Sequence, residues 1–139
     1  MKGYFYLLCV LYVLHTGVNI FVAVVEPHGM YVMKALIDAV CFALCLVGSY
    51  GLAHRKPIWT TWTWRTIYQA TLVMGGFFFI AQGFGDVLGI DHPAADAGPI
   101  NLAMLLIKYL LFAIPVVIYE YAMRTGKWPG EEDKDNVNE

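Results

Sequence analysis

The sequence predicts an all-α integral membrane protein, folded as a bundle of four antiparallel transmembrane helices. Hydrophobic residues make up 59% of the 139-residue chain and charged residues only 14%, against roughly 45–50% and about 25% in soluble domains. The apolar residues are concentrated in four runs, each near the roughly 20 residues that a helix needs to cross a bilayer. These runs make the lipid bilayer the expected environment of the chain. The formal net charge of -2 does not predict nucleic acid as a partner.

The four predicted spans are residues 4–25, 33–53, 66–87 and 101–122. Each is expected to be a helix, because hydrocarbon offers an open backbone no hydrogen-bond partner. The first run is too long for the apolar part of a signal peptide, and no small-residue cleavage site follows it, so we expect a retained helix. Short connections make successive helices antiparallel neighbours. In this prediction residues 1–125 form one helical domain and 126–139 a polar, disordered cytoplasmic tail.

Small residues and a proline mark the third and fourth spans. Four glycines in the third span predict close packing against a neighbouring helix rather than against lipid: Gly75, Gly76, Gly83 and Gly85. In the fourth span Pro115 lacks a backbone N–H and is expected to kink the helix. Glu120 precedes Arg124 by four residues, a spacing that predicts a surface ion pair.

The basic residues predict the orientation of the protein in the membrane. Seven of the nine Lys and Arg residues flank the spans on the side of the two termini: Lys2, Arg55, Lys56, Arg65, Arg124, Lys127 and Lys134. Because cytoplasmic loops carry the excess of positive charge, we expect both termini to lie in the cytoplasm. The expected membrane is a bacterial inner membrane. The tryptophan-rich segment 59–65 lies on the same side and is typical of an interfacial aromatic anchor.

Polar and ionisable side chains interrupt all four spans at similar depth. Each ionisable residue within a span costs about 2.5–3.5 kcal/mol on insertion scales, so such residues usually face the interior of the bundle and find partners there. Most of them fall in the half of the bilayer predicted to be outer, and the histidine falls near the middle. We therefore predict that six residues line a polar path or pair with one another: His15, Asn19, Asp38, Gln82, Asp86 and Lys108.

Lys108 lies within a largely apolar span, and the sequence allows three alternatives for the position of its ammonium group. Asp86 is the preferred partner, because the third and fourth helices are directly connected. Asp38 is the alternative, although Lys34 precedes it by four residues and competes for its carboxylate. Lys108 can also extend its stem to the outer head groups without any partner.

Histidines suggest two further sites. His15 is expected to form an interhelical hydrogen bond or to relay protons, since histidine titrates near neutral pH. His28, Asp91 and His92 lie in the predicted outer loops and are weak candidates for a divalent-metal site, although nothing in their spacing requires one. The sequence implies no particular cofactor.

These features support three hypotheses for function. The first is a transporter or ion or proton conduit component, which we expect to be a homo-oligomer because four helices are few. The second is an accessory or assembly subunit of a larger membrane complex, whose polar residues would pair with partner helices. The third is a membrane protein that binds haem, quinone or a metal. No catalytic motif is recognisable, so an enzyme is not predicted.

Overall fold

A computed structural model describes residues 2–89 and 99–129 of the chain. This part of the chain contains four helices, which confirms the predicted fold class: α1 (Lys2–Val25), α2 (Gly29–His54), α3 (Thr61–Leu88) and α4 (Pro99–Thr125). All four are long and apolar enough to cross a membrane. Each helix extends beyond its predicted apolar run, because polar and aromatic residues continue the helical hydrogen bonding outside the apolar segment.

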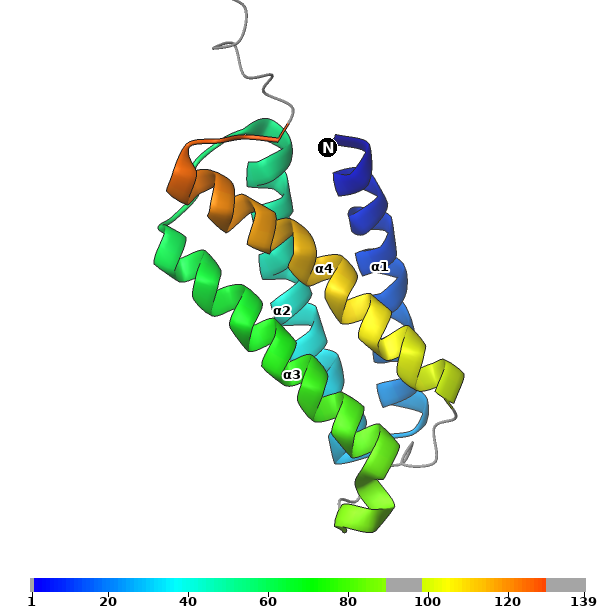
Figure 1. The fold of residues 1–139 in the computed structure, drawn as a ribbon. Coiled ribbons are helices and arrows are strands. Elements are labelled where there is room, and N and C mark those ends of the chain that lie inside the picture. The colour runs from blue at the N-terminus through cyan, green and yellow to red at the C-terminus, as the bar shows by residue number, and fades with distance from the viewer. Residues whose placement is uncertain (1, 90–98, 130–139) are drawn as a thin grey trace, which may run out of the picture.

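The helices form an antiparallel bundle in which α2 is central. The first turn of α1 and the last turn of α4 lie at the same end of the bundle (Figure 1). Helix α2 packs against each of the other three helices, and α3 and α4 form a second closely packed pair. In α1 only 6% of the most apolar window is buried, against 39% in α4. Helix α1 is therefore the helix most exposed to lipid, and the protein is an integral membrane protein with four candidate spans.

The end of the bundle that holds the two termini is closely packed through glycines and aromatic rings. A Cβ on Gly51 would lie 2.5 Å from the Tyr119 ring, and one on Gly48 would lie 2.8 Å from Trp64. Tyr119 and Trp64 are fully buried and meet edge to face. We call this region, where α2 ends, α3 begins and α4 ends, the packed half.

Hydrogen bonds tie the connection between α2 and α3 to α4 in the packed half. The Tyr119 hydroxyl donates to the carbonyl of Lys56 at 2.6 Å and accepts from the backbone N–H of Ile58 at 2.7 Å. The indole N–H of Trp64 donates to the carbonyl of Ile58. Backbone groups of a connection without its own regular structure are thus satisfied by two buried side chains.

The ion pair of Glu120 differs from the one predicted from sequence spacing. Its carboxylate lies 2.9 Å from the guanidinium of Arg65 on α3 and is buried. The guanidinium of Arg124, the expected partner, lies instead over the Tyr121 ring. The prediction was wrong because spacing along one helix identifies a possible neighbour but not the competing partner that another helix presents.

The glycines of α3 play different roles. A Cβ on Gly75 would lie 2.6 Å from the Tyr109 ring, and one on Gly83 would lie 3.2 Å from Leu102, so both positions allow close approach of α4. A Cβ on Gly76 would meet nothing within 4 Å, so this glycine is not required for packing. The packing of Gly85 lies outside the described part of the chain. Helix α4 continues through Pro115, which is buried.

Candidate functional site

A buried carboxylate on α2 is the centre of a cluster of charged and polar side chains. Asp38 is 1% exposed. Its Oδ2 atom accepts from the ammonium of Lys34 at 2.6 Å and from that of Lys108 at 3.1 Å, and the Tyr109 hydroxyl donates to Oδ1. The carboxylate is therefore held by its own helix and by two consecutive residues of α4.

Helix α1 completes the cluster with a histidine and an amide. His15 Nε2 lies 3.0 Å from Asp38 Oδ2 and 3.2 Å from the ammonium of Lys108. The side-chain nitrogen of Asn19 lies 2.8 Å from the same His15 nitrogen and 3.2 Å from Asp38 Oδ2. We call these residues the Asp38 cluster: Asp38, Lys34, Lys108, Tyr109, His15 and Asn19.

Local sequence explains how each helix contributes to the Asp38 cluster. Residues four apart lie on one face of a helix, so Lys34 accompanies Asp38 on α2, and His15 accompanies Asn19 on α1. The ammonium of Lys108 also lies 4.9 Å from the ring centroid of Tyr109, within the range of a cation–π interaction. The three helices therefore converge on one carboxylate from separate segments of the chain.

One nitrogen of His15 cannot satisfy all of its neighbours in a single protonation state. The Lys108 ammonium is a donor without acceptor capacity, and the Asp38 carboxylate is an acceptor without a proton to donate. Both lie within 3.2 Å of His15 Nε2. Without a proton, Nε2 accepts from Lys108 and repels Asp38; with a proton, it donates to Asp38 and conflicts with Lys108. The site therefore has two competing hydrogen-bond patterns that differ in the position of a proton.

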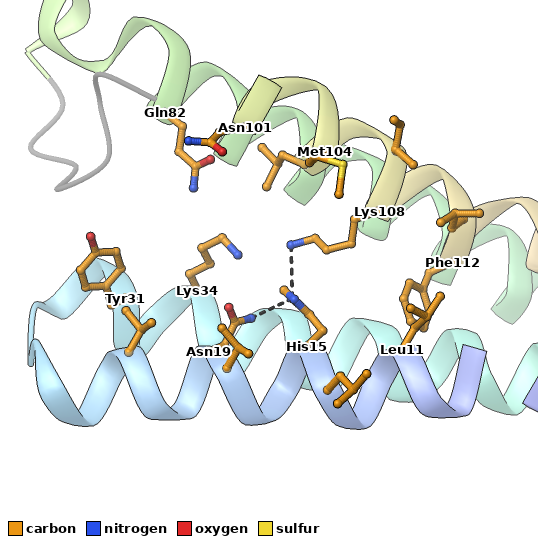
Figure 2. A pocket seen from close by; sticks show the side chains of 16 residues that line it. Leu11, His15, Asn19, Tyr31, Lys34, Gln82, Asn101, Met104, Lys108 and Phe112 are labelled. Carbon is orange, nitrogen blue, oxygen red and sulfur yellow. Dashed lines mark hydrogen bonds between the residues drawn. The ribbon is translucent and has the colours of Figure 1, made fainter. Parts of the chain in front are cut away.

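A groove of about 770 Å³ opens beside the Asp38 cluster, between α1 and α4. Figure 2 shows Lys34, Asn19, Gln82 and Asn101 towards one end of this groove and the apolar side chains of Leu11 and Phe112 towards the other, with Lys108 and His15 between them. Lys108 and His15 extend from opposite walls towards one another. The groove is therefore amphipathic along its length.

The structure brings together four of the six residues predicted for the polar path: His15, Asn19, Asp38 and Lys108. Gln82 lines the groove at its polar end. Position 86 lies on α3, but its side chain is outside the described residues. Lys108 contacts Asp38, the alternative partner, and does not merely extend to the head groups.

Sequence reasoning missed Tyr109 and treated Lys34 only as a competitor for Asp38. Tyr109 is buried and donates to the carboxylate. A buried tyrosine hydroxyl usually finds a hydrogen-bond partner, so the tyrosine directly after an intramembrane lysine was the available signal.

The candidate metal site is only partly within the described residues. His28 caps α2, where its Nδ1 accepts from the backbone N–H of Met30 at 3.3 Å. Among residues 2–89 and 99–129 no three His, Cys, Asp or Glu side chains are grouped to hold a metal ion. Asp91 and His92 lie outside this part of the chain, so that site stays a prediction.

The fold and the site define the class of this protein as a small integral membrane protein with four spans and a buried charge cluster. No protein-family model matches the chain, and comparisons with curated proteins and with solved structures find no match. The function is therefore argued from the geometry of the site.

Proposed function

We propose that the protein is a component of a membrane transporter or conduit, in which the Asp38 cluster passes a proton between Lys108 and His15. The observation that carries this proposal is the shared His15 nitrogen, which lies between the Lys108 ammonium and the Asp38 carboxylate. A histidine in this position is suited to move a proton between groups near neutral pH.

The proton step is a short internal transfer. In the first state the Lys108 ammonium donates to unprotonated His15 Nε2. In the second state the proton has moved from the Lys108 nitrogen to His15 Nε2, which leaves a neutral amine and an imidazolium that donates to Asp38. The total charge of the cluster is unchanged, and each donor–acceptor distance is already 3.0–3.2 Å. Lys34 and Tyr109 hold the carboxylate in both states.

The polar lining of the groove extends from the Asp38 cluster towards one end of the bundle. Asn19, Gln82 and Asn101 line the groove on that side. Towards the packed half, the rings of Phe42 and Phe112 stack with centroids 4.3 Å apart. In this conformation, the polar lining among the described residues stops at these rings, so passage across the membrane requires a conformational change or a second copy of the chain.

Proton flux into liposomes tests the proposal. The purified protein is reconstituted with a pH-sensitive dye inside, and a pH gradient is imposed. His15→Gln removes the shared proton carrier, and loss of a positioned acid–base group reduces proton transfer by about a hundredfold or more. His54→Gln is the matched control, because His54 lies at the end of α2 in the packed half, far from the Asp38 cluster, where it bonds the carbonyl of Tyr50 and packs against the rings of Tyr50 and Phe5.

The outcome also separates the alternative functions. Flux that is equal in His15→Gln and in the original protein contradicts the proton role. Stable copurification with one other membrane protein in mild detergent, together with no flux, would instead favour the accessory-subunit hypothesis. A visible absorption spectrum would favour the hypothesis of haem binding.

A further inference from the structure

We propose that the groove between α1 and α4 binds an anionic single-chain amphiphile from the bilayer, namely a long-chain carboxylate whose head group contacts Lys34 and Lys108. This inference names a substrate class for the proposed transporter. It rests on the proposed function only where it treats the bound amphiphile as the molecule that is transported. Binding itself is a separate property of the groove.

The charge of the Asp38 cluster favours an anion. With His15 neutral, the ammonium groups of Lys34 and Lys108 outnumber the carboxylate of Asp38, the one carboxylate that contacts them in the described part of the chain. An unbalanced charge within the bilayer is unfavourable. A ligand carboxylate beside the two ammonium groups would balance it.

The two lysines have hydrogen-bonding capacity left for such a ligand. Each ammonium has three N–H donors, but Asp38 Oδ2 is already within 3.2 Å of four nitrogen atoms from Lys34, Lys108, His15 and Asn19. A single carboxylate oxygen cannot accept well from all four. Both lysines line the groove, so their remaining N–H groups can reach a second carboxylate placed there.

The apolar part of the groove fits a hydrocarbon chain. Leu11, Leu14, Leu111 and Phe112 line it on the side away from the polar end. Near this apolar part the Tyr4 hydroxyl donates to the carbonyl of Leu111 at 2.9 Å, which joins α1 to α4. The volume of about 770 Å³ lies within the roughly 300–1,000 Å³ of small-molecule sites.

The direction of the groove matches that of a lipid in one leaflet. Asn19 and Asn101 lie near the ends of α1 and α4 at the polar side of the groove, and Leu11 and Phe112 lie near the middle of the same helices. A bound amphiphile would therefore hold its head group nearer the membrane surface and its chain towards the bilayer centre.

The groove opens sideways to lipid. Leu14, Val18 and Met104 line its rim and are 60–63% exposed, and exposed apolar side chains on membrane-spanning helices contact hydrocarbon. An amphiphile can thus enter from the bilayer without crossing water. A small water-soluble anion would gain nothing from the apolar lining.

Binding of radiolabelled dodecanoate to the full chain in phosphatidylcholine nanodiscs tests this inference, with empty nanodiscs as background and labelled dodecanol as the uncharged probe. We expect saturable binding of dodecanoate and little specific binding of dodecanol. Lys108→Gln and Lys34→Gln should each weaken binding about tenfold, since each removes a charge-assisted hydrogen bond. Lys56→Gln, on an exposed loop lysine, is the matched control.

A second variant tests the apolar part without changing any charge. Leu11→Trp fills the groove and should also weaken dodecanoate binding about tenfold, whereas Leu7→Trp, one turn away on exposed α1 surface, should not. If Lys108→Gln fails to fold, as judged by size-exclusion chromatography, the Leu11→Trp result decides. No saturable binding, equal binding of dodecanol, or unchanged binding in Leu11→Trp would overturn the inference.

The binding assay and the flux assay fail independently. Flux that depends on His15 without any dodecanoate binding would remove this inference and leave the proposed function intact. Dodecanoate binding without flux would remove the proposed function and leave the groove as a binding site.

Discussion

The two ends of the bundle satisfy their buried polar groups in opposite ways. In the packed half, the Tyr119 hydroxyl has one acceptor and one donor, and each bond fixes a backbone group of the connection between α2 and α3. In the Asp38 cluster, four nitrogen atoms share one carboxylate oxygen, and one histidine nitrogen has neighbours of both kinds. The first arrangement specifies one structure, whereas the second permits several arrangements of protons and ligands. The packed half therefore serves as the scaffold of the bundle, and the Asp38 cluster has the features of a functional site.

Neutralising each buried carboxylate gives the largest expected difference between the two ends. Asp38→Asn leaves the ammonium groups of Lys34 and Lys108 without their carboxylate, and breaking a buried ion pair typically costs about 3–5 kcal/mol. Glu120→Gln should cost less than about 1 kcal/mol, because its partner Arg65 is 46% exposed. Reversible unfolding in mixed detergent measures both free energies. Equal losses in the two variants would contradict the contrast between the ends.

Overpacking tests the closeness of the helices in the packed half. A Cβ on Gly51 would lie 2.5 Å from the Tyr119 ring, so Gly51→Ala should destabilise the protein by about 1–3 kcal/mol. Gly76→Ala is the matched control, because its Cβ would meet nothing within 4 Å, and alanine favours helix over glycine by roughly 0.5–1 kcal/mol. Thermal unfolding in the same detergent compares them. A stable Gly51→Ala variant would show that α2 and α4 can separate there.

Removing one hydroxyl from each end separates stability from function. Tyr119→Phe loses two hydrogen bonds to backbone groups and Tyr109→Phe loses one to the Asp38 carboxylate, so each should cost about 1–3 kcal/mol of unfolding free energy. Only Tyr109→Phe should slow proton flux, because only its hydroxyl holds Asp38. Flux in liposomes and unfolding are measured on both variants. Equal flux in the two would place Tyr109 outside the proton step.

The smallest structural effect is expected at the polar end of the groove. Gln82 lines the groove, so Gln82→Leu should change the unfolding free energy by less than about 0.5 kcal/mol, while making the approach to Lys108 less polar. A reduced proton flux with unchanged stability would support the polar end of the groove as the place where protons enter. Undiminished flux would place the entrance elsewhere.

The spans could be predicted from the sequence because length and hydropathy alone determine whether a helix can cross a bilayer. The four-residue spacing of His15 and Asn19 also places them on one face of a helix. Periodicity could not identify the partner of Lys108, because it assigns residues to faces but does not say which helices are neighbours. Asp86 was preferred on the direct connection of α3 to α4, yet α4 also packs against α2, where Asp38 lies. Tyr109 was missed because a buried aromatic residue in an apolar run is usually only part of the core.

The pairing of Lys34 with Asp38 also bears on how the protein enters the membrane during synthesis. Both residues belong to α2 and lie four residues apart, so they can neutralise each other as soon as this helix has formed. Lys108 follows 70 residues after Asp38 and leaves the ribosome much later. The charge of Asp38 therefore has a local counter-ion while α2 is inserted, and Lys108 joins the site as a second ammonium group only when α4 is added.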